Sequence, residues 1–390
     1  MKKISRKGMI VGIIILFIGA SVLPSINGDI EKSISFDVNK FNFNFEKKTY
    51  KETHIIDNPQ IEWNKTYGGF DEDFIGTFSS IKETSDNGLI LLARTTSFGL
   101  GSGDIWLIRL DSDGNMLWNV TFGGTNDEWP GSIIESSDDS YLIVGTTFSY
   151  GLGVSDVWLI KTDFYGNILW DKTFGGSGME WGQDIYRISN NEYFIACRTS
   201  SYGSGDDDNW LIKIDENGNI LWDKIFGKQG SEWWAKLIKT NDGGYASIGY
   251  TSNPSASNID MQLIKIDDEG NEIWSKNYDY RNFDMGHGIC ECPDGGFIFT
   301  GVAFNYWGEE MNIYIVKTDQ LGNVLWSNTI GGNSFDEGNT IVKTINNNYL
   351  IGGSLDTDLL LLNIDENGNY LFNCKYGGIG YESAIDIIEL

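Results

Sequence analysis

Histidine and cysteine are scarce in this sequence. The two histidines are His54 and His287, and the four cysteines are Cys197, Cys290, Cys292 and Cys374. Two imidazoles give little material for a histidine-rich metal centre or a Ser-His-Asp triad, and four cysteines are too few for a disulfide-built secreted scaffold. We therefore expect no metal, no cofactor and no catalytic residues. Cys290 and Cys292 alternate along one segment, which predicts packing or a local thiol pair.

Positive charge and proline are also scarce. The 390 residues include 28 Lys and Arg against 55 Asp and Glu, a net charge of -27, and only 5 prolines. A surface of that charge repels nucleic acid and anionic membranes, so we expect no nucleic-acid partner. Neutral glycans, basic proteins and cations are compatible partners. No window shows a sustained helical period, and the high aromatic content excludes disorder.

The long apolar runs that mark membrane spans are missing. The run from Met9 to Leu23 has 15 residues, fewer than a spanning helix usually needs, and it follows a basic start. Residues 1–28 therefore predict a signal peptide or N-terminal anchor, and hence a secreted protein or one tethered to the outer face of the cell membrane. Residues 29–60, where Ile34, Phe36 and Val38 alternate with polar residues, predict an extended arm or linker.

What the sequence does contain is a repeat. Residues 104–118 predict a β-hairpin with the turn Asp111-Ser-Asp-Gly-Asn115. The Asp-x-x-Gly-Asn turn recurs, and seven residues after its Asp stands an aromatic residue: Trp118, Trp170, Trp222, Trp274, Trp326 or Phe372. Counting from Trp63, these aromatic residues are 55, 52, 52, 52, 52 and 46 residues apart. A period near 50 predicts an all-β fold, a β-propeller whose blades each have four strands, a to d.

The strand count predicts an incomplete blade. Residues 61–390 hold six complete repeats, preceded by a lone d strand at Trp63 and followed by a lone a strand at 384–390. We expect the two termini to share a partial seventh blade, in a monomer. Either the chain is truncated by about half a repeat or the ring closes on the partial blade. The alternative is a six-bladed ring with spare terminal strands. The tryptophans of the d strands are expected to be largely buried between blades.

The repeat resembles a known family. The pattern is carried best by Trp158, Lys161, Asp163, Gly166, Asn167, Trp170, Phe174, Gly175 and Gly176. It is similar to the seven-bladed β-propeller (SBBP) repeat family, and the resemblance implies extracellular binding and scaffold proteins. A weaker resemblance is to the tryptophan-docking repeats of pyrroloquinoline-quinone propellers. Those enzymes place adjacent cysteines over the cofactor, whereas Glu291 separates Cys290 from Cys292.

An acid recurs six residues after the end of each d strand, and an aromatic residue often follows it. In a propeller this crossover lies on the same face as the b–c loops, which predicts an acidic, aromatic-lined binding face. The candidate binding residues are Asp73, Glu128, Trp129, Glu180, Trp181, Glu232, Trp233, Asp284 and Asp336, with Tyr150, Tyr202 and Trp307 from the b–c loops.

Each candidate also has a structural interpretation. An acid at every crossover can accept backbone N–H bonds and hold the blade junction, and the tryptophans can pack between blades. The acids that begin the c strands, such as Asp104, are expected to pair with basic neighbours such as Arg109. We predict a non-catalytic binding or scaffold module for a glycan, protein or cation. The alternative is a propeller enzyme acting on polysaccharide, or a quinone-type oxidoreductase. An enzyme needs polar groups that break the repeat, and few residues do so: His287, Arg94 and Arg198.

Overall fold

The structure is a computed structural model. It describes residues 11–12, 64–75, 80–253, 258–305, 310–332, 334–377 and 381–389. Apart from Val11 and Gly12, the predicted leader and the arm at 29–60 lie outside the described residues, as do Trp63 and Trp307. The described part of the chain holds no helix that could cross a membrane.

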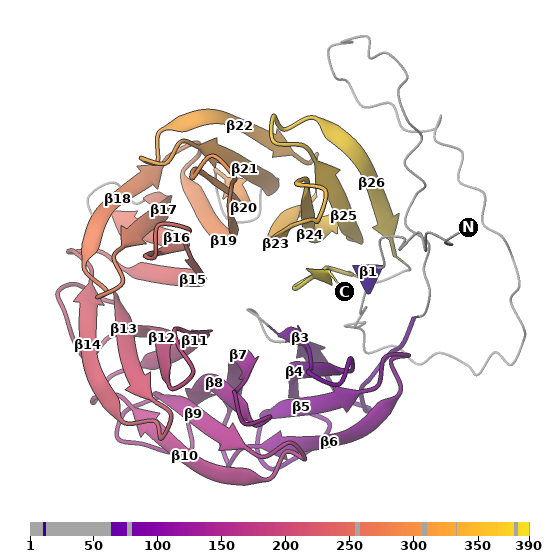
Figure 1. The fold of residues 1–390 in the computed structure, drawn as a ribbon, viewed down its shortest axis with the longest axis vertical. Coiled ribbons are helices and arrows are strands. Elements are labelled where there is room, and N and C mark those ends of the chain that lie inside the picture. Colours follow the sequence, from indigo (N-terminus) through magenta and orange to yellow (C-terminus); the bar gives the residue numbers. More distant parts are fainter. Residues whose placement is uncertain are drawn as a thin grey trace, which may run out of the picture.

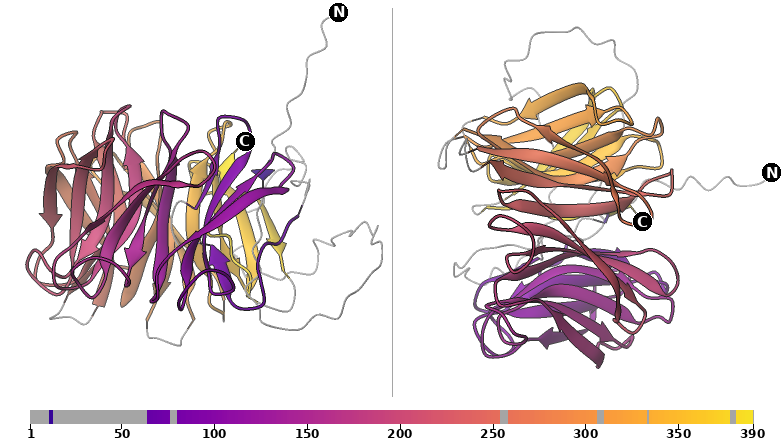
Figure 2. Two further views of the ribbon diagram at one scale, coloured as in Figure 1. Left: turned by 90° about the horizontal axis from the view of Figure 1, so that it is seen from below. Right: turned by 90° about the vertical axis from the view of Figure 1, so that its left-hand side faces the viewer.

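Six antiparallel blades, each with four strand positions, form a ring around a central axis (Figure 1), and the strands run between the two faces of the disc (Figure 2). Strand a lies innermost and strand d forms the outer rim (Figure 1). The all-β prediction and the propeller prediction are therefore confirmed.

In each blade the strands follow one another along the chain in the order a, b, c and d. Blade 1 is β2 (Asp73–Ile75) with β3 (Ile81–Glu83), then β4 (Leu89–Thr95), β5 (Asp104–Leu110) and β6 (Met116–Phe122). Blade 2 is β7 (Glu128–Glu135), β8 (Tyr141–Thr147), β9 (Asp156–Thr162) and β10 (Ile168–Phe174). Blade 3 is β11 (Glu180–Arg187), β12 (Glu192–Thr199), β13 (Asp208–Asp215) and β14 (Ile220–Phe226).

The other three blades follow the same plan. Blade 4 is β15 (Glu232–Lys239), β16 (Tyr245–Asn253), β17 (Asn258–Ile266) and β18 (Glu272–Tyr278). Blade 5 is β19 (Phe283–Glu291), β20 (Phe297–Phe304), β21 (Asn312–Thr318) and β22 (Val324–Ile330). Blade 6 is β23 (Glu337–Lys343), β24 (Tyr349–Leu355), β25 (Asp358–Ile364) and β26 (Tyr370–Tyr376).

The b and c strands form the core. Every residue of β8 and of β9 is buried, because both faces of a blade pack against neighbouring blades. One cluster joins Leu142 and Leu159 of blade 2 to Ile185 and Tyr193 of blade 3. The d strands have one side on solvent, which explains the exposed Ile168 and Leu169 of β10. A continuous apolar run therefore marks b and c, as expected for strands covered on both faces.

The c–d turns are built by their aspartates. The Oδ1 atom of Asp163 accepts the backbone N–H groups of Tyr165 at 2.8 Å and Asn167 at 2.9 Å, and its Oδ2 accepts the Asn167 amide at 2.8 Å. Gly166 supplies the left-handed conformation, with φ of 83°. The sequence interpretation of these turns as hairpin turns is confirmed.

The d-strand tryptophans interlock the blades. The Trp170 ring lies over Gly218 in the c–d turn of the next blade, where a Cβ would meet the ring at 2.8 Å. Two residues on, the Lys172 ammonium donates to Asn219 of the same turn at 2.8 Å. Trp118, Trp170, Trp222, Trp274 and Trp326 are half-buried. Each ring also packs against a buried hydrophobic cluster. The expected packing between blades is therefore confirmed, although part of each ring on the outer rim stays open to solvent.

The cations of the c strands have different partners from those expected. Lys161 pairs with Asp138 at 3.0 Å, in the a–b turn of its own blade, and Lys265 pairs likewise with Asp242 at 3.0 Å. Arg109 pairs with Asp86. The acids that begin the c strands lie at the other end of these strands, so the predicted pairing with them was wrong.

The termini share a partial seventh blade, as predicted. The Glu382 N–H donates to Thr357 of blade 6 at 2.8 Å, as the Glu128 N–H donates to Gly103 of blade 1 at 2.8 Å. The Oδ2 atom of Asp386 then accepts the Ser80 N–H of blade 1 at 2.9 Å. Residues 382–387 thus occupy the place of strand a, although only β27 (Ile388–Glu389) is a strand, paired with β1 (Val11–Gly12).

The outer position of this blade is taken by residues 64–69. The Lys65 ammonium donates to Asn115 at 3.0 Å, the contact that d strands make elsewhere, and the Tyr67 hydroxyl donates to the Gly114 carbonyl. Tyr67 and Ile388 pack against one core cluster, so the two ends of the propeller meet. The expectation of a d strand at this position was wrong in detail, because residues 64–69 form no strand.

Candidate functional site

The crossover acids are buried inside the blade junctions. The Oε1 atom of Glu128 accepts the Thr147 hydroxyl at 2.9 Å, and its Oε2 accepts the Gly124 N–H at 2.9 Å. Glu180 makes the same two bonds, to Thr199 and Gly176, at 2.9 Å each. The fold uses these carboxylates to fasten each crossover to its blade: Asp73, Glu128, Glu180, Glu232, Asp284, Asp336 and Glu382 are all buried. A ligand-binding role for the predicted acids stays a prediction.

A second acid lies against the crossover acids Glu128, Glu180 and Glu232. A Cβ on Gly123 would stand 1.4 Å from Oδ1 of Asp104 and 2.7 Å from Oε2 of Glu128, so both carboxylates crowd the same glycine. Burial raises the pKa of Asp104 to about 6, and the charges of Glu128 and Asp127 act in the same direction. Burial likewise raises the pKa of Asp284 to about 6. These pairs are internal, and no partner cation reaches Oδ1 of Asp104 within the described residues.

Aromatic and arginine side chains form a continuous row on the same face. Arg94 lies over two rings, 5.2 Å from the Phe74 centroid and 4.5 Å from the Trp129 centroid. Trp129 and Trp181 have centroids 6.2 Å apart. Arg198 lies 5.7 Å from the Trp181 ring and 4.4 Å from the Trp233 ring. We call these six residues the aromatic–arginine arc: Phe74, Arg94, Trp129, Trp181, Arg198 and Trp233.

Two aspartates hold the arginines of the arc in place. Arg94 pairs with Asp127, and Asp127 also accepts the Trp129 indole N–H at 2.8 Å. The Nε of Arg198 lies 3.4 Å from Asp207. The ion pairs neutralise the guanidinium groups, which keep their flat faces against the rings. The arc is therefore an electrically balanced surface.

Cross-strand pairing explains how the sequence builds the arc. Phe74 stands opposite Arg94 across β2 and β4, and Trp181 stands opposite Arg198 across β11 and β12. The side chains of such pairs interact directly. The same positions carry Met285 with Val302 in blade 5 and Glu337 with Ser354 in blade 6. The arc thus covers blades 1 to 4 and departs from the repeat beyond them.

A group of polar side chains lies near the arc positions of blades 5 and 6. His287 hydrogen-bonds Asn339, and burial lowers its pKa while the neighbouring Glu337 carboxylate opposes that shift. The Asn339 amide donates to Ser383 at 2.8 Å. The Ser354 hydroxyl lies 2.9 Å from the Tyr381 hydroxyl, and burial raises the pKa of Tyr381 to about 12. We call His287, Glu337, Asn339, Ser354 and Tyr381 the polar cluster.

The predicted loop tyrosines lie outside the arc. The Tyr150 hydroxyl donates to the Gly123 carbonyl at 3.1 Å, and the Tyr202 hydroxyl donates to Gly175 at 3.1 Å. Both tyrosine rings are 43% to 45% exposed and cover the tryptophan that begins strand c below them. The structure brings together Trp129, Trp181 and Trp233 among the predicted residues. Trp307 cannot be placed, since it lies outside the described residues.

The described residues form no assembled site for a metal ion or for thiol chemistry. No group of three His, Cys, Asp or Glu side chains is placed to hold a metal ion there. Cys290 donates its thiol to the Ile341 carbonyl at 3.1 Å, and burial raises its pKa to about 12. Cys197 and Cys292 are buried free thiols. Burial keeps such thiols unreactive.

Comparison with known proteins identifies the fold only. No family model matches the chain, and no curated protein matches it. Among solved structures, puromycin hydrolase aligns with a TM-score of 0.50 at 11% identity over 78% of this chain, which spans 47% of that structure. The ulvan lyase of polysaccharide lyase family PL25 gives a TM-score of 0.47 at 8% identity, covering 73% of this chain and 75% of that one. A protein of unknown function from Bacteroides caccae gives 0.40 at 11%, covering 65% and 81%.

Sequence reasoning missed the coupling between the arginines and the tryptophans. Arg94 and Arg198 were recognised only as departures from the repeat. The strand pairing shows the relation: each arginine lies on strand b, directly opposite the aromatic residue that follows the crossover acid on strand a. That relation joins residues about 20 positions apart and requires the strand pairing to be known.

Proposed function

We propose that this protein is a non-catalytic binding module that holds a glycan on the aromatic–arginine arc. The observation that carries the proposal is the restriction of the arc to blades 1 to 4. A fold made of repeats needs no such restriction, because structural residues recur in every blade. Residues that break the repeat at one part of the channel mouth are typical of a site.

The chemistry of the arc supports a sugar ligand. A sugar ring has an apolar C–H face and a rim of hydroxyl groups. Half-buried indole rings match the face, and guanidinium and aspartate groups match the rim. Since Arg94 and Arg198 are already paired with aspartates and the protein carries a charge of -27, a neutral glycan fits better than an acidic one.

We further propose that the chain acts outside the cell, secreted or tethered by its N-terminus. The basic start and the Met9 to Leu23 run support export, and the repeat pattern supports membership of the seven-bladed β-propeller repeat family. Finding the full-length chain in the cytoplasmic fraction after cell fractionation would count against this placement.

A second candidate is an enzyme acting on the same class of polymer. The polar cluster favours it, because His287 and Glu337 lie side by side opposite the arc and both belong to positions that break the repeat. A neutral imidazole beside a carboxylate is a common general-base arrangement. The two candidates differ in whether the bound polymer is cleaved.

Glycan binding and cleavage can be measured on the same exported protein. We expect a neutral oligosaccharide from a glycan array to quench tryptophan fluorescence, and Trp181→Ala to weaken its binding at least tenfold, about 1.4 kcal/mol. Trp170→Ala removes the same side chain on the outer rim and serves as the matched control with unchanged affinity. Chromatography of the bound polymer after incubation tests turnover. Equal affinities for the two variants would refute the site, and released fragments would favour the enzyme.

A further inference from the structure

The axial channel contains lysines where the repeat has none. Lys82 on β3 pairs across the sheet with Ile90, the position held by Ile134, Tyr186, Ile238, Cys290 and Val342 in the other blades. Lys236 on β15 stands where neighbouring blades have Ser132, Asp184, Gly288 and Thr340. The two positions therefore carry cations that the blade structure does not require.

These lysines have no ion-pair partner. Among the described residues, neither Lys82 nor Lys236 has a carboxylate oxygen within salt-bridge distance. Burial lowers the pKa of Lys82, and the charge of Lys236 acts in the same direction. Unpaired like charges inside a protein are costly unless something compensates them.

The nearby carboxylates are engaged elsewhere. Asp184 accepts the Leu237 N–H at 3.1 Å and the Ile185 N–H at 3.0 Å. Asp386 accepts the Ser80 N–H at 2.9 Å and the Ile387 N–H at 3.0 Å. Their charges attract Lys82 from a distance, while their oxygens are held by backbone amides.

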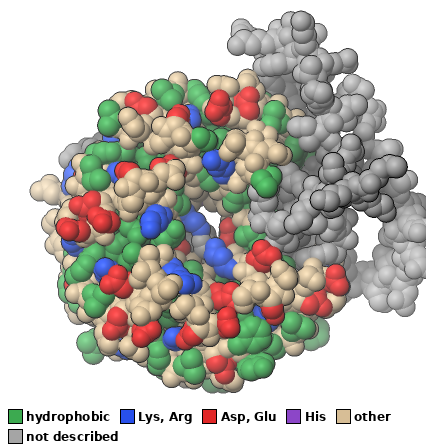
Figure 3. Space-filling view, in the orientation of Figure 1, with side chains coloured by type: hydrophobic (Ala, Val, Ile, Leu, Met, Phe, Trp, Pro, Cys, Tyr) green, Lys and Arg blue, Asp and Glu red, His purple; other side chains and the backbone are tan. Residues whose placement is uncertain are grey.

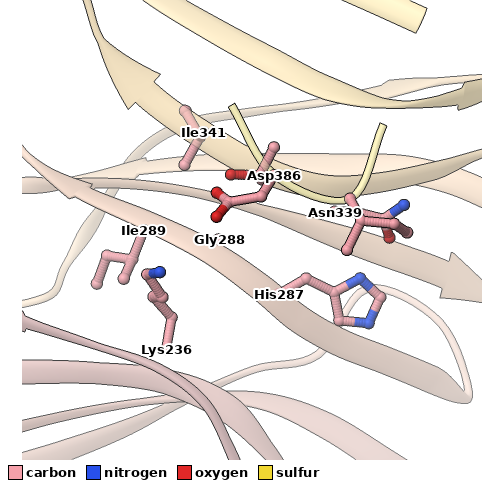
Figure 4. A pocket seen from close by; sticks show the side chains of 9 residues that line it. Lys236, His287, Gly288, Ile289, Asn339, Ile341 and Asp386 are labelled. Atoms are coloured by element: carbon pink, nitrogen blue, oxygen red, sulfur yellow. The ribbon is translucent and has the colours of Figure 1, made fainter. Parts of the chain in front are cut away.

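Lys236 also lines a pocket, and His287, Asn339 and Asp386 lie on its wall (Figure 4). The Lys236 ammonium and the Asp386 carboxylate lie on one side of this pocket, and the His287 ring and the Asn339 amide lie on the other (Figure 4). The Nδ1 atom of His287 has no hydrogen-bond partner in the described part of the chain. An amide, an imidazole and an ammonium group supply the donors that an oxyanion needs.

The mouth of the channel continues the positive charge. Arg187, Lys239 and Lys343 end β11, β15 and β23. The acids in the same position on β7 and β19 bind backbone groups of neighbouring blades: Glu135 accepts the Ser85 N–H at 3.0 Å and Glu291 accepts the Asn241 N–H at 2.8 Å. Among the acids that end the described inner strands, only Glu83 on β3 is exposed. Lys and Arg side chains accordingly surround the central opening in Figure 3.

We propose that the axial channel binds a small oxyanion, a sulfate or phosphate group, at the pocket lined by Lys236, with Lys82 of the inner strand β3 as the second cation. The anion is either free or an ester group on a larger ligand. It compensates two unpaired cations in a protein that is otherwise strongly acidic, and a channel of this kind focuses the local field. This site lies apart from the aromatic–arginine arc and does not depend on glycan binding there.

Calorimetric titration of the full chain with millimolar sodium phosphate or sodium sulfate tests the site, with sodium chloride at equal ionic strength as the reference. We expect saturable heat for an oxyanion and none for chloride. The double variant Lys82→Gln/Lys236→Gln should bind at least tenfold more weakly. The matched controls are Lys172→Gln and Lys276→Gln, which remove the same charge on outer strands and should bind like the unaltered protein.

A second measurement separates binding from structure. Without anion, Lys82→Gln should melt at the same temperature as the unaltered protein or higher, because the repulsion by Lys236 is removed. A structural role predicts a lower melting temperature. A sulfated monosaccharide distinguishes the two sources: binding of the inorganic ion indicates a free anion, and binding of the ester alone indicates an anionic group on a larger ligand. The absence of saturable binding by both, or equal binding by the double variant, would overturn the proposal.

Discussion

Asp104 carries a carboxyl group where its charge is disfavoured. It is 2% exposed, and its pKa is raised to about 6 by burial and by the neighbouring Glu128 and Asp127. An unfolded chain releases the same proton near pH 3.9. Between these two pH values the folded protein holds a proton that the unfolded chain has lost. The free energy of unfolding therefore falls as the pH rises from the unfolded pKa to the folded pKa, and it does not recover at higher pH.

Asp104→Asn should remove this loss. Blade 5 already has Asn312 in the equivalent place, beside the crossover acid Asp336. We expect the melting temperature of the variant at pH 7.5 to rise by roughly 1–3 °C, and the gain to vanish near pH 4. Thermal unfolding followed by circular dichroism across this range measures both values.

Asp163→Asn is a control of opposite sign. The side-chain and backbone N–H groups of Asn167 lower the pKa of Asp163, so its charge stabilises the turn above the unfolded pKa. That variant should lose stability at pH 7.5. If Asp104→Asn instead has the pH profile of the unaltered protein, the buried position of Asp104 does not disfavour its charge.

At this scale the sequence predicts residue types better than residue roles. The recurring acids and the tryptophans of the arc were recognisable because they stand at the same position in successive repeats. The structural interpretation of these acids, as acceptors of backbone N–H bonds at the blade junction, agrees with the Gly124 N–H that Glu128 accepts. The Thr147 hydroxyl that Glu128 also accepts could be found only from the paired strands.

The c–d turn is the element that couples one blade to the next. Its aspartate fixes the turn, its glycine accepts the ring of the preceding blade, and its asparagine accepts a lysine from that blade. The turn was predictable because its hydrogen bonds join residues four positions apart. The half-burial of Trp170 was not, since it depends on a contact with Gly218 in another repeat.

Gly218→Ala should be more destabilising than Gly243→Ala. Both glycines have left-handed backbones, with φ of 70° and 94°, so each alanine carries a cost of roughly 1–2 kcal/mol. At Gly218 the added Cβ also meets the Trp170 ring at 2.8 Å, whereas at Gly243 nothing lies within 4 Å. Chemical denaturation of the two variants gives the difference. Equal losses would mean that the ring moves aside freely and that the interlock contributes little.

At the scale of the whole ring, closure depends on a seventh blade for which the described residues supply no middle strands. Strand a elsewhere is held by its ladder to strand b, as β11 is by β12. Residues 382–387 have no such partner strand in the described part of the chain, and they keep the position of strand a without forming a strand. The repeat count predicted where the termini meet. It could not predict this loss of regular structure, which follows from the missing hydrogen bonds of the ladder.

The link between the last segment and blade 1 is Asp386. Its Oδ2 accepts the N–H groups of Ser80 at 2.9 Å and Ile81 at 3.3 Å. Asp184 makes the equivalent bond inside the ring, to the Leu237 N–H at 3.1 Å, where complete blades continue on both sides. The two aspartates are therefore a matched pair that differs only in the completeness of the surrounding blade.

Asp386→Ala should open the ring at the seventh position, while Asp184→Ala should act only locally. We expect hydrogen exchange at residues 80–83 to become at least tenfold faster in the first variant, because Ser80 and Ile81 lose their acceptor at the one incomplete junction. In the second variant, Leu237 keeps its place opposite Ser247 in the ladder of blade 4, so exchange in β15 should change less. Mass spectrometry of the exchanged peptides measures both, and similar protection in the two variants would show that closure does not rest on the terminal segment.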